Sequence, residues 1–175
     1  MRPRVGVALV VGALGLVGLA AAGGDVMEDL LGRWFRLREF IATRHAVDNT
    51  APAWAVENLR RLVATTLDPL RDALGRPIRV TSGFRSVELN RAVDGAAQSQ
   101  HTRGEAVDFK VDGVASADVV DAIVRLGLPF DQVIWYAAER GGHVHVSLTG
   151  GGNRGEVLHA PAGGGYVPWT TRRVA

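Results

Sequence analysis

Two short segments of this chain concentrate side chains that commonly bind a catalytic metal. His101 and Asp108 lie in SQHTRGEAVDF, and His143 and His145 alternate in HVHVSL. Two histidines and one carboxylate are a frequent ligand set for catalytic zinc, which keeps a fourth position open for water. The pattern points to a hydrolase that needs neither a cysteine nor a serine nucleophile, and the sequence contains no cysteine.

The spacing of these residues favours a loop and strands over a helix. Gly104 between His101 and Asp108 would let the chain turn sharply. Alternation places His143 and His145 on the same face of a strand. We therefore assign the zinc ligands to His101, Asp108 and His145. His143 would then stand beside the metal, where it could polarise a substrate carbonyl or donate a proton. Ordinary surface or core histidines are the alternative, which the clustering in two glycine-flanked segments disfavours.

Three further side chains near this cluster are candidates for substrate binding. Arg85 lies in SGFRS, at a predicted junction between a strand and a helix. It could clamp a substrate carboxylate or a developing oxyanion, or it could form a surface salt bridge. Ser99 and Gln100 directly precede His101, and they could orient its ring or simply form the turn.

The remaining candidates give weaker signals. His45 and His159 lie in polar segments without a partner, so we expect both to be solvated. Trp54 and Trp135 are expected in the core rather than on a substrate platform. Asp131 and Gln132, at the start of a predicted strand, could support the site, or they could simply cap or turn the chain.

The hydrophobic pattern predicts the elements that must position these side chains. Helices are predicted over residues 25–46, 52–74 (with a kink or interruption near Pro69), 86–93 and 116–126, and Ser86 and Ser116 are the predicted N-terminal caps of the last two. Strands are predicted over residues 78–82, 106–111, 132–136 and 143–148, with a glycine-rich loop at 149–165 and an edge strand at 166–167. This order predicts an α+β fold: a small antiparallel sheet with N-terminal helices packed on it and the zinc site on the sheet face.

Length and composition bound the organisation and the partners. The 175 residues suit one domain, expected at 25–175 with a glycine-rich C-terminal tail. The formal net charge is +2, and the basic residues are nearly all arginine. No dense Lys/Arg block is present, so we expect no nucleic-acid partner. No long apolar stripe is left over once the core is assigned, so we expect a monomer.

The N-terminal residues 1–24 predict export. Arg2 and Arg4 precede the uncharged stretch VGVALVVGALGLVGLAAAGG, which ends in small residues. A cleaved signal peptide and an uncleaved anchor in the inner membrane through residues 5–24 both fit this pattern. In either case the rest of the chain would face the periplasm or the cell wall.

Taken together, the motifs resemble those of the M15 zinc peptidases. The resemblance runs from about Phe35 to Leu158, and its anchors are SGFRS at 82–86, LNRAVDGAAQSQHTRGEAVDF at 89–109, FDQVIW at 130–135, HVHVS at 143–147 and NRGEVL at 153–158. The family includes D-alanyl-D-alanine carboxypeptidases and phage or bacterial peptidoglycan endopeptidases. The resemblance implies the same zinc ligands, a substrate or transition-state role for Arg85, and an auxiliary role for His143.

One position departs from the family pattern. Several members carry an acidic general base three residues before the last zinc histidine, and Gly142 stands there in this chain. Glu139 lies nearby in the same loop and could substitute, depending on how the hairpin folds.

The resulting expectation is a zinc peptidase that cuts peptidoglycan stem peptides or their cross-links. Its catalytic residues would be His143, Arg85 and Glu139, with substrate contacts from Arg85, Ser99 and Gln100. Carboxypeptidase and endolysin-type endopeptidase activities both fit. The rival is a catalytically silent cell-wall-binding module that retains its metal.

Overall fold

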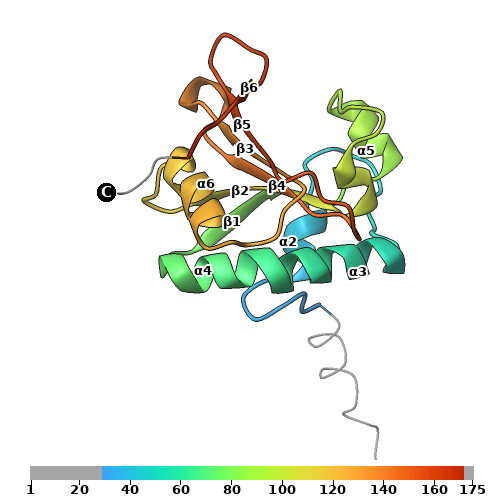
Figure 1. Cartoon of the computed structure of the whole chain (residues 1–175). Helices are drawn as coiled ribbons and strands as arrows, with labels where there is room; N and C mark the ends of the chain where they lie inside the picture. The colour runs from blue at the N-terminus through green and yellow to red at the C-terminus, as the bar shows by residue number, and fades with distance from the viewer. Residues whose placement is uncertain (1–28, 172–175) are drawn as a thin grey trace, which may run out of the picture.

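The computed structural model of the protein describes residues 29–171 (Figure 1). Residues 1–28 and 172–175 lie outside that description, and with them the expected signal peptide or anchor and the start of the first predicted helix. Between residues 29 and 171, no helix is both long enough and apolar enough to cross a membrane.

The segment 29–46 differs from the continuous helix that its apolar residues predicted. Only α2 (Leu37–Ile41) is helical. The carboxylate of Asp68 accepts the backbone N–H groups of Arg33 and Trp34, at 2.7 and 3.3 Å, so these groups bond to a distant residue rather than within a helix. The prediction was wrong because apolar residues can also be buried from a loop, as are Leu31 and Phe35.

The second predicted helix is confirmed as one long helical segment. It comprises α3 (Ala53–Leu62), the π-helical turn η1 (Val63–Leu67) and α4 (Asp68–Leu74). The wider π turn ends two residues before Pro69, which has no N–H to donate, and the helix continues through the proline. Gly75 ends α4 in the left-handed conformation at φ +59°.

Six strands form one mixed sheet in the order β1-β2-β4-β3-β5-β6. Their bounds are β1 (Ile78–Ser82), β2 (Ala106–Val111), β3 (Gln132–Tyr136), β4 (Val144–Ser147), β5 (Glu156–Ala160) and β6 (Val167–Pro168). β3 pairs with β5 in parallel, whereas the other neighbours are antiparallel. The expected antiparallel sheet is therefore only partly right. The segment 149–165 was expected to be a loop, but it contains β5.

The longer helices all pack on one face of the sheet. The long helix of α3 and α4 crosses one face, and α6 (Ser116–Arg125) packs on the same side (Figure 1). One core joins them, and its sheet side is lined by Val107, Phe109, Val111, Val133, Val144 and Val146. Side chains that alternate with these point to the opposite face, which is left for the polar cluster.

Two helix caps had been predicted, and one is confirmed. Ser86 precedes α5 (Val87–Ala92), and its hydroxyl accepts the N–H of Leu89. Ser116 instead lies inside α6, and its hydroxyl donates to the carbonyl oxygen of Gly142 at 2.8 Å. This bond ties the β3–β4 loop to α6, so the residue serves tertiary structure rather than capping.

The burial predicted for His45, His159, Trp54 and Trp135 is confirmed for two of these four residues. His45 is exposed and Trp135 packs against the core, as predicted. The prediction that Trp54 is in the core is wrong, because this residue is 56% exposed at the start of α3. The prediction that His159 is solvated is also wrong: the residue is half-buried, and its ring stacks on Trp135 with the ring centroids 3.5 Å apart.

Candidate active site

Two adjacent strands bring Asp108 and His145 side by side. Asp108 on β2 lies directly opposite His145 on β4, and both side chains alternate with the core-facing valines, so they point away from α3, α4 and α6. In β1 the register shifts between Val80 and Ser82, so that Ser82 pairs with Asp108. A bulge of this kind redirects side chains at a strand end, and here it turns Ser82 toward the cluster.

His101 reaches the same place from a short 3-10 turn, η2 (Gln100–Arg103). Gly104 ends the turn at φ +66°, and a Cβ at this position would lie 2.4 Å from the backbone oxygen of Ala55. Nδ1 of His101 lies 2.7 Å from the carbonyl oxygen of Gly83. A carbonyl can only accept, so Nδ1 carries the proton and Nε2 keeps its lone pair for the cluster.

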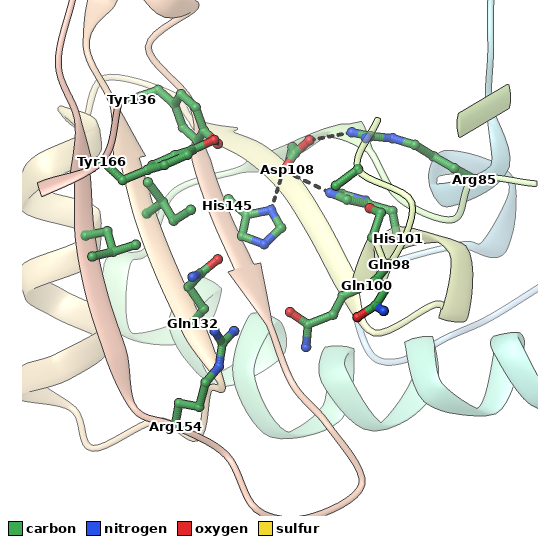
Figure 2. Close-up of a pocket in the computed structure, with 14 residues that line it drawn as sticks. Arg85, Gln98, Gln100, His101, Asp108, Gln132, Tyr136, His145, Arg154 and Tyr166 are labelled. Carbon is green, nitrogen blue, oxygen red and sulfur yellow. Dashed lines mark hydrogen bonds and ion pairs between the residues drawn. The ribbon is translucent and has the colours of Figure 1, made fainter. Parts of the chain in front are cut away.

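The three predicted ligands meet around one carboxylate oxygen (Figure 2). Oδ1 of Asp108 lies 3.3 Å from His101 Nε2 and 2.8 Å from His145 Nδ1. The ligand atoms of all three residues lie within 4.8 Å of one another. Bond lengths of about 2.0 Å place the donors of a tetrahedral zinc about 3.3 Å apart. The donor types and their spacing therefore fit a zinc ion held by three protein ligands.

Burial and mutual attraction set the protonation of this group. Burial opposes ionisation of Asp108, yet His101 and His145 together lower the pKa of this carboxyl well below its usual range. Burial lowers the pKa of His101, although the negative charge of Asp108 opposes this effect. An ionised carboxylate and a neutral imidazole are the forms that bind a metal.

Arg85 contacts the cluster rather than the protein surface. Its Nη2 donates to Oδ2 of Asp108 at 2.9 Å, and its Nε donates to the hydroxyl of Ser82 at the same distance. Its side chain is 18% exposed, which excludes the alternative of a surface salt bridge. Its backbone N–H also bonds to the carbonyl oxygen of His101. Arg85 therefore orients Asp108 from behind while it still borders the cleft described next.

A cleft of about 350 Å³ opens over the cluster. Ser99 and Gln100 both line it, and Figure 2 shows Gln100 beside the cluster. Its other lining residues are Arg85, Ala96, Gln98, His101, Asp108, Gln132, Ile134, Tyr136, His145, Arg154, Leu158 and Tyr166.

The two candidates for proton transfer lie outside that set. His143 is half-buried and stacks on Tyr136 with centroids 4.1 Å apart, and burial lowers its pKa. Glu139 is exposed in the 3-10 turn η3 (Ala138–Arg140). Gly142 has φ +56°, a conformation that L side chains rarely adopt, so an acidic residue would be strained there. Neither His143 nor Glu139 is among the described residues that line the cleft.

Several cleft residues escaped the sequence reasoning. Ile134 and Tyr136 alternate with Gln132 along β3, and strand alternation from the register with His145 could have placed both on the site face. Tyr166 offered no comparable signal, because it lies in a glycine-rich segment, whereas Arg154 lies in the NRGEVL motif, for which the family resemblance implied no chemical role. Tyr136 and Tyr166 approach each other through their hydroxyls at 3.3 Å, and burial raises the pKa of Tyr136, so its phenol stays protonated.

Comparison with known proteins identifies the family. The model of the Peptidase M15 family matches residues 34–147, which contain all three predicted ligands, Arg85 and His143. The chain belongs to this family, as its motifs indicated. The matched range includes β1 to β4 and η2, the elements that carry the metal cluster.

Among curated proteins, the chain is similar to the peptidoglycan L,D-endopeptidase MepK. The match to the protein of Escherichia coli (strain K12) is 32% identical over 56 residues, and those of E. coli O157:H7 and Shigella flexneri match equally. It covers 29% of this chain and 31% of each relative, so the chain spans under a third of their length.

Proposed function

We propose that this protein is a zinc-dependent peptidase that hydrolyses peptide bonds in peptidoglycan stem peptides or cross-links. One observation carries the proposal: His101, Asp108 and His145 lie together at a cleft, and all three belong to the segment that matches the M15 family. The similarity to a peptidoglycan endopeptidase supports the choice of substrate.

The three residues would hold zinc through nitrogen and carboxylate donors. A zinc ion supplies Lewis-acid activation of water and of the scissile carbonyl. The chain contributes the orientation of the donors: the Gly83 carbonyl fixes the tautomer of His101, and Arg85 fixes one oxygen of Asp108. Arg85 also offers positive charge at the edge of the cleft, where an oxyanion or a substrate carboxylate could be stabilised.

Proton transfer is assigned to a residue of the β3–β4 loop. His143 is the first candidate, because its ring stacks on Tyr136, which lines the cleft, and burial favours its neutral form. Glu139 is the second, and it requires the loop to move toward the cleft. A proton carrier typically contributes about 10²–10⁴-fold to the rate.

An endopeptidase fits the cleft better than a carboxypeptidase. Its lining continues on both sides of the row formed by His145, Ile134 and Leu158: Gln132 lies along β3 in one direction and Tyr136 in the other. A peptide chain could therefore extend past the metal on both sides. We expect the protein to act as a monomer on the periplasmic or cell-wall side, consistent with export through residues 1–24.

Two variants test the assignment. Peptide release from purified peptidoglycan should fall by about 10²–10⁴-fold in His143→Ala or in Glu139→Gln while bound zinc is retained, and the affected variant identifies the proton carrier. Full activity in both would exclude both residues. A wild-type chain that binds zinc and peptidoglycan but releases no peptide would instead support the silent binding module.

A further inference from the structure

Arg154 lies in the wall of the cleft and has no role in the metal cluster. It precedes β5, in the glycine-rich segment that links β4 to β5. Its side chain is 54% exposed, and Figure 2 shows it extending toward Gln132 on the side of the cleft opposite Arg85. A guanidinium in this position is available to a ligand.

A buried carboxylate holds Arg154 in this orientation. Asp131 is only 2% exposed, and its Oδ2 accepts from Nη2 of Arg154 at 2.6 Å. Nε of Arg154 lies 3.1 and 3.2 Å from the two oxygens, and the backbone N–H of Arg154 donates to Oδ1 at 2.9 Å. Asp131 also accepts from the amide of Gln100 at 3.1 Å, so it connects both walls of the cleft.

The contacts of Arg154 leave donors for a ligand. A guanidinium carries five N–H groups in a fixed fork. Nε and one N–H of Nη2 point to Asp131, and one N–H of Nη1 reaches Glu156 at 3.2 Å. Within residues 29–171, these contacts leave one N–H on each terminal nitrogen, which matches the two oxygens of a carboxylate.

The register of the sheet gives the separation of Arg154 from the metal cluster. Glu156, which Arg154 contacts, pairs with Gln132, and that row lies two residues along the sheet from the row of His145. Two residues span about 7 Å, and β5 lies two strand spacings, about 10 Å, from β4. A group bound by Arg154 would therefore belong to a residue near the cut bond but not to the bond itself. Ile134 and Leu158 provide an apolar surface between the two.

We propose that Arg154 binds a free carboxylate of the stem peptide on a residue flanking the scissile bond. Stem peptides carry such carboxylates on glutamate and diamino-acid residues, whereas a neutral peptide would offer no anionic acceptor to the two N–H groups of Arg154 that Asp131 and Glu156 leave unused. Asp131 is then a positioning residue, which keeps the fork of Arg154 directed into the cleft. This inference deepens the proposed function and rests on it for the identity of the substrate.

The test compares one stem peptide, which contains the bond that the protein cuts, in two synthetic forms. One form has free carboxylates, and the other has the same carboxylates as amides. The selectivity is the ratio of kcat/KM for the acid to kcat/KM for the amide. It is measured in the full wild-type chain, Arg154→Gln, Arg154→Lys and the control Arg79→Gln. Arg79 pairs with Asp112 at 2.7 Å on the surface of β1, outside the cleft.

We expect the wild type and Arg79→Gln to prefer the acid by about 10- to 100-fold, the range for a hydrogen-bonded charge pair. The ratio should fall close to one in Arg154→Gln and lie between the two in Arg154→Lys. Because both peptides are tested on the same preparation, partial unfolding cancels from the ratio, and the Lys variant decides if the Gln variant fails to fold. An unchanged ratio, or no preference in the wild type, would overturn the proposal.

A binding measurement separates this inference from the proposed function. If the wild type cuts neither peptide, the peptidase assignment fails, and calorimetry with the same two peptides then decides the role of Arg154. Tighter binding of the acid that is lost in Arg154→Gln would support the carboxylate site. Equal binding of acid and amide would refute it.

Discussion

Asp108 is the residue on which the site converges. Its Oδ1 faces both His101 and His145, and its Oδ2 accepts from Arg85. This carboxylate stays ionised, since His101 and His145 together lower its pKa despite burial. Changes to any neighbour should therefore act on metal binding before they act on overall stability.

Loss of one ligand should remove zinc. In His145→Ala we expect bound zinc and peptide hydrolysis to fall together by at least about 100-fold, because two remaining donors hold the ion poorly. His45→Ala is the matched control, since His45 is exposed and lies outside the cleft that holds the cluster. Zinc is measured by elemental analysis after dialysis. Wild-type zinc content in His145→Ala would contradict the ligand assignment.

Arg85→Gln should weaken metal affinity or activity by about 10- to 100-fold, the usual cost of removing a group that orients a metal ligand. The guanidinium holds Asp108 at 2.9 Å and is itself held by Ser82, whereas glutamine is too short to keep both contacts. Titration with a competing zinc chelator gives the affinity. An affinity and a rate both equal to those of the wild type would show that Arg85 has neither role.

At the scale of elements, the position of His101 depends on the close packing of η2 against α3. A Cβ on Gly104 would lie 2.4 Å from the backbone oxygen of Ala55, and the residue has φ +66°. Gly113 has a similar φ of +74° but no atom within 4 Å of an added Cβ. The two glycines therefore separate the cost of the conformation from the cost of the contact.

We expect Gly104→Ala to lower the free energy of unfolding by about 2–4 kcal/mol, because a left-handed alanine and a backbone clash add together. Gly113→Ala should lose only about 1–2 kcal/mol, the conformational part. Urea denaturation followed by circular dichroism measures both. Equal losses in the two variants would mean that η2 does not depend on close packing against α3.

The elements also show which parts of the fold could be predicted from sequence. Alternation along 106–111 and 143–147 and the turn at Gly104 predicted the meeting of His101, Asp108 and His145, which the structure brings together. β5 could not be predicted, because its five residues lie in a glycine-rich segment and pair in parallel with β3. The pairing of Asp131 with Arg154 spans 23 residues, a contact that only the folded sheet creates.

At the scale of the whole molecule, Asp131 joins three segments: the start of β3, the loop before β5 through Arg154, and η2 through Gln100. The hydrogen bonds from Arg154 hold the pKa of Asp131 below its ordinary value. A lowered pKa in the folded state means that the contribution of Asp131 to stability is present above its unfolded pKa of about 3.9 and is lost as the pH falls below it.

Asp131→Asn should therefore lower the free energy of unfolding by about 1–3 kcal/mol at neutral pH, the range for hydrogen bonds to a charged group. The difference from wild type should stay constant down to about pH 5 and shrink as the pH falls through 4. Thermal and urea unfolding across this range measure it. A difference that grows as the pH is lowered would contradict the lowered pKa.

Hydrolysis by this protein should depend on a zinc ion held by the His101–Asp108–His145 group. The decisive measurement quantifies zinc in chain purified without chelator and follows the digestion of peptidoglycan by mass spectrometry, with and without EDTA. We predict about one zinc per chain, as three protein ligands require, and peptide release that EDTA abolishes and added zinc restores. The absence of zinc would contradict the ligand assignment, and peptide release that is unaffected by EDTA would contradict zinc-dependent hydrolysis.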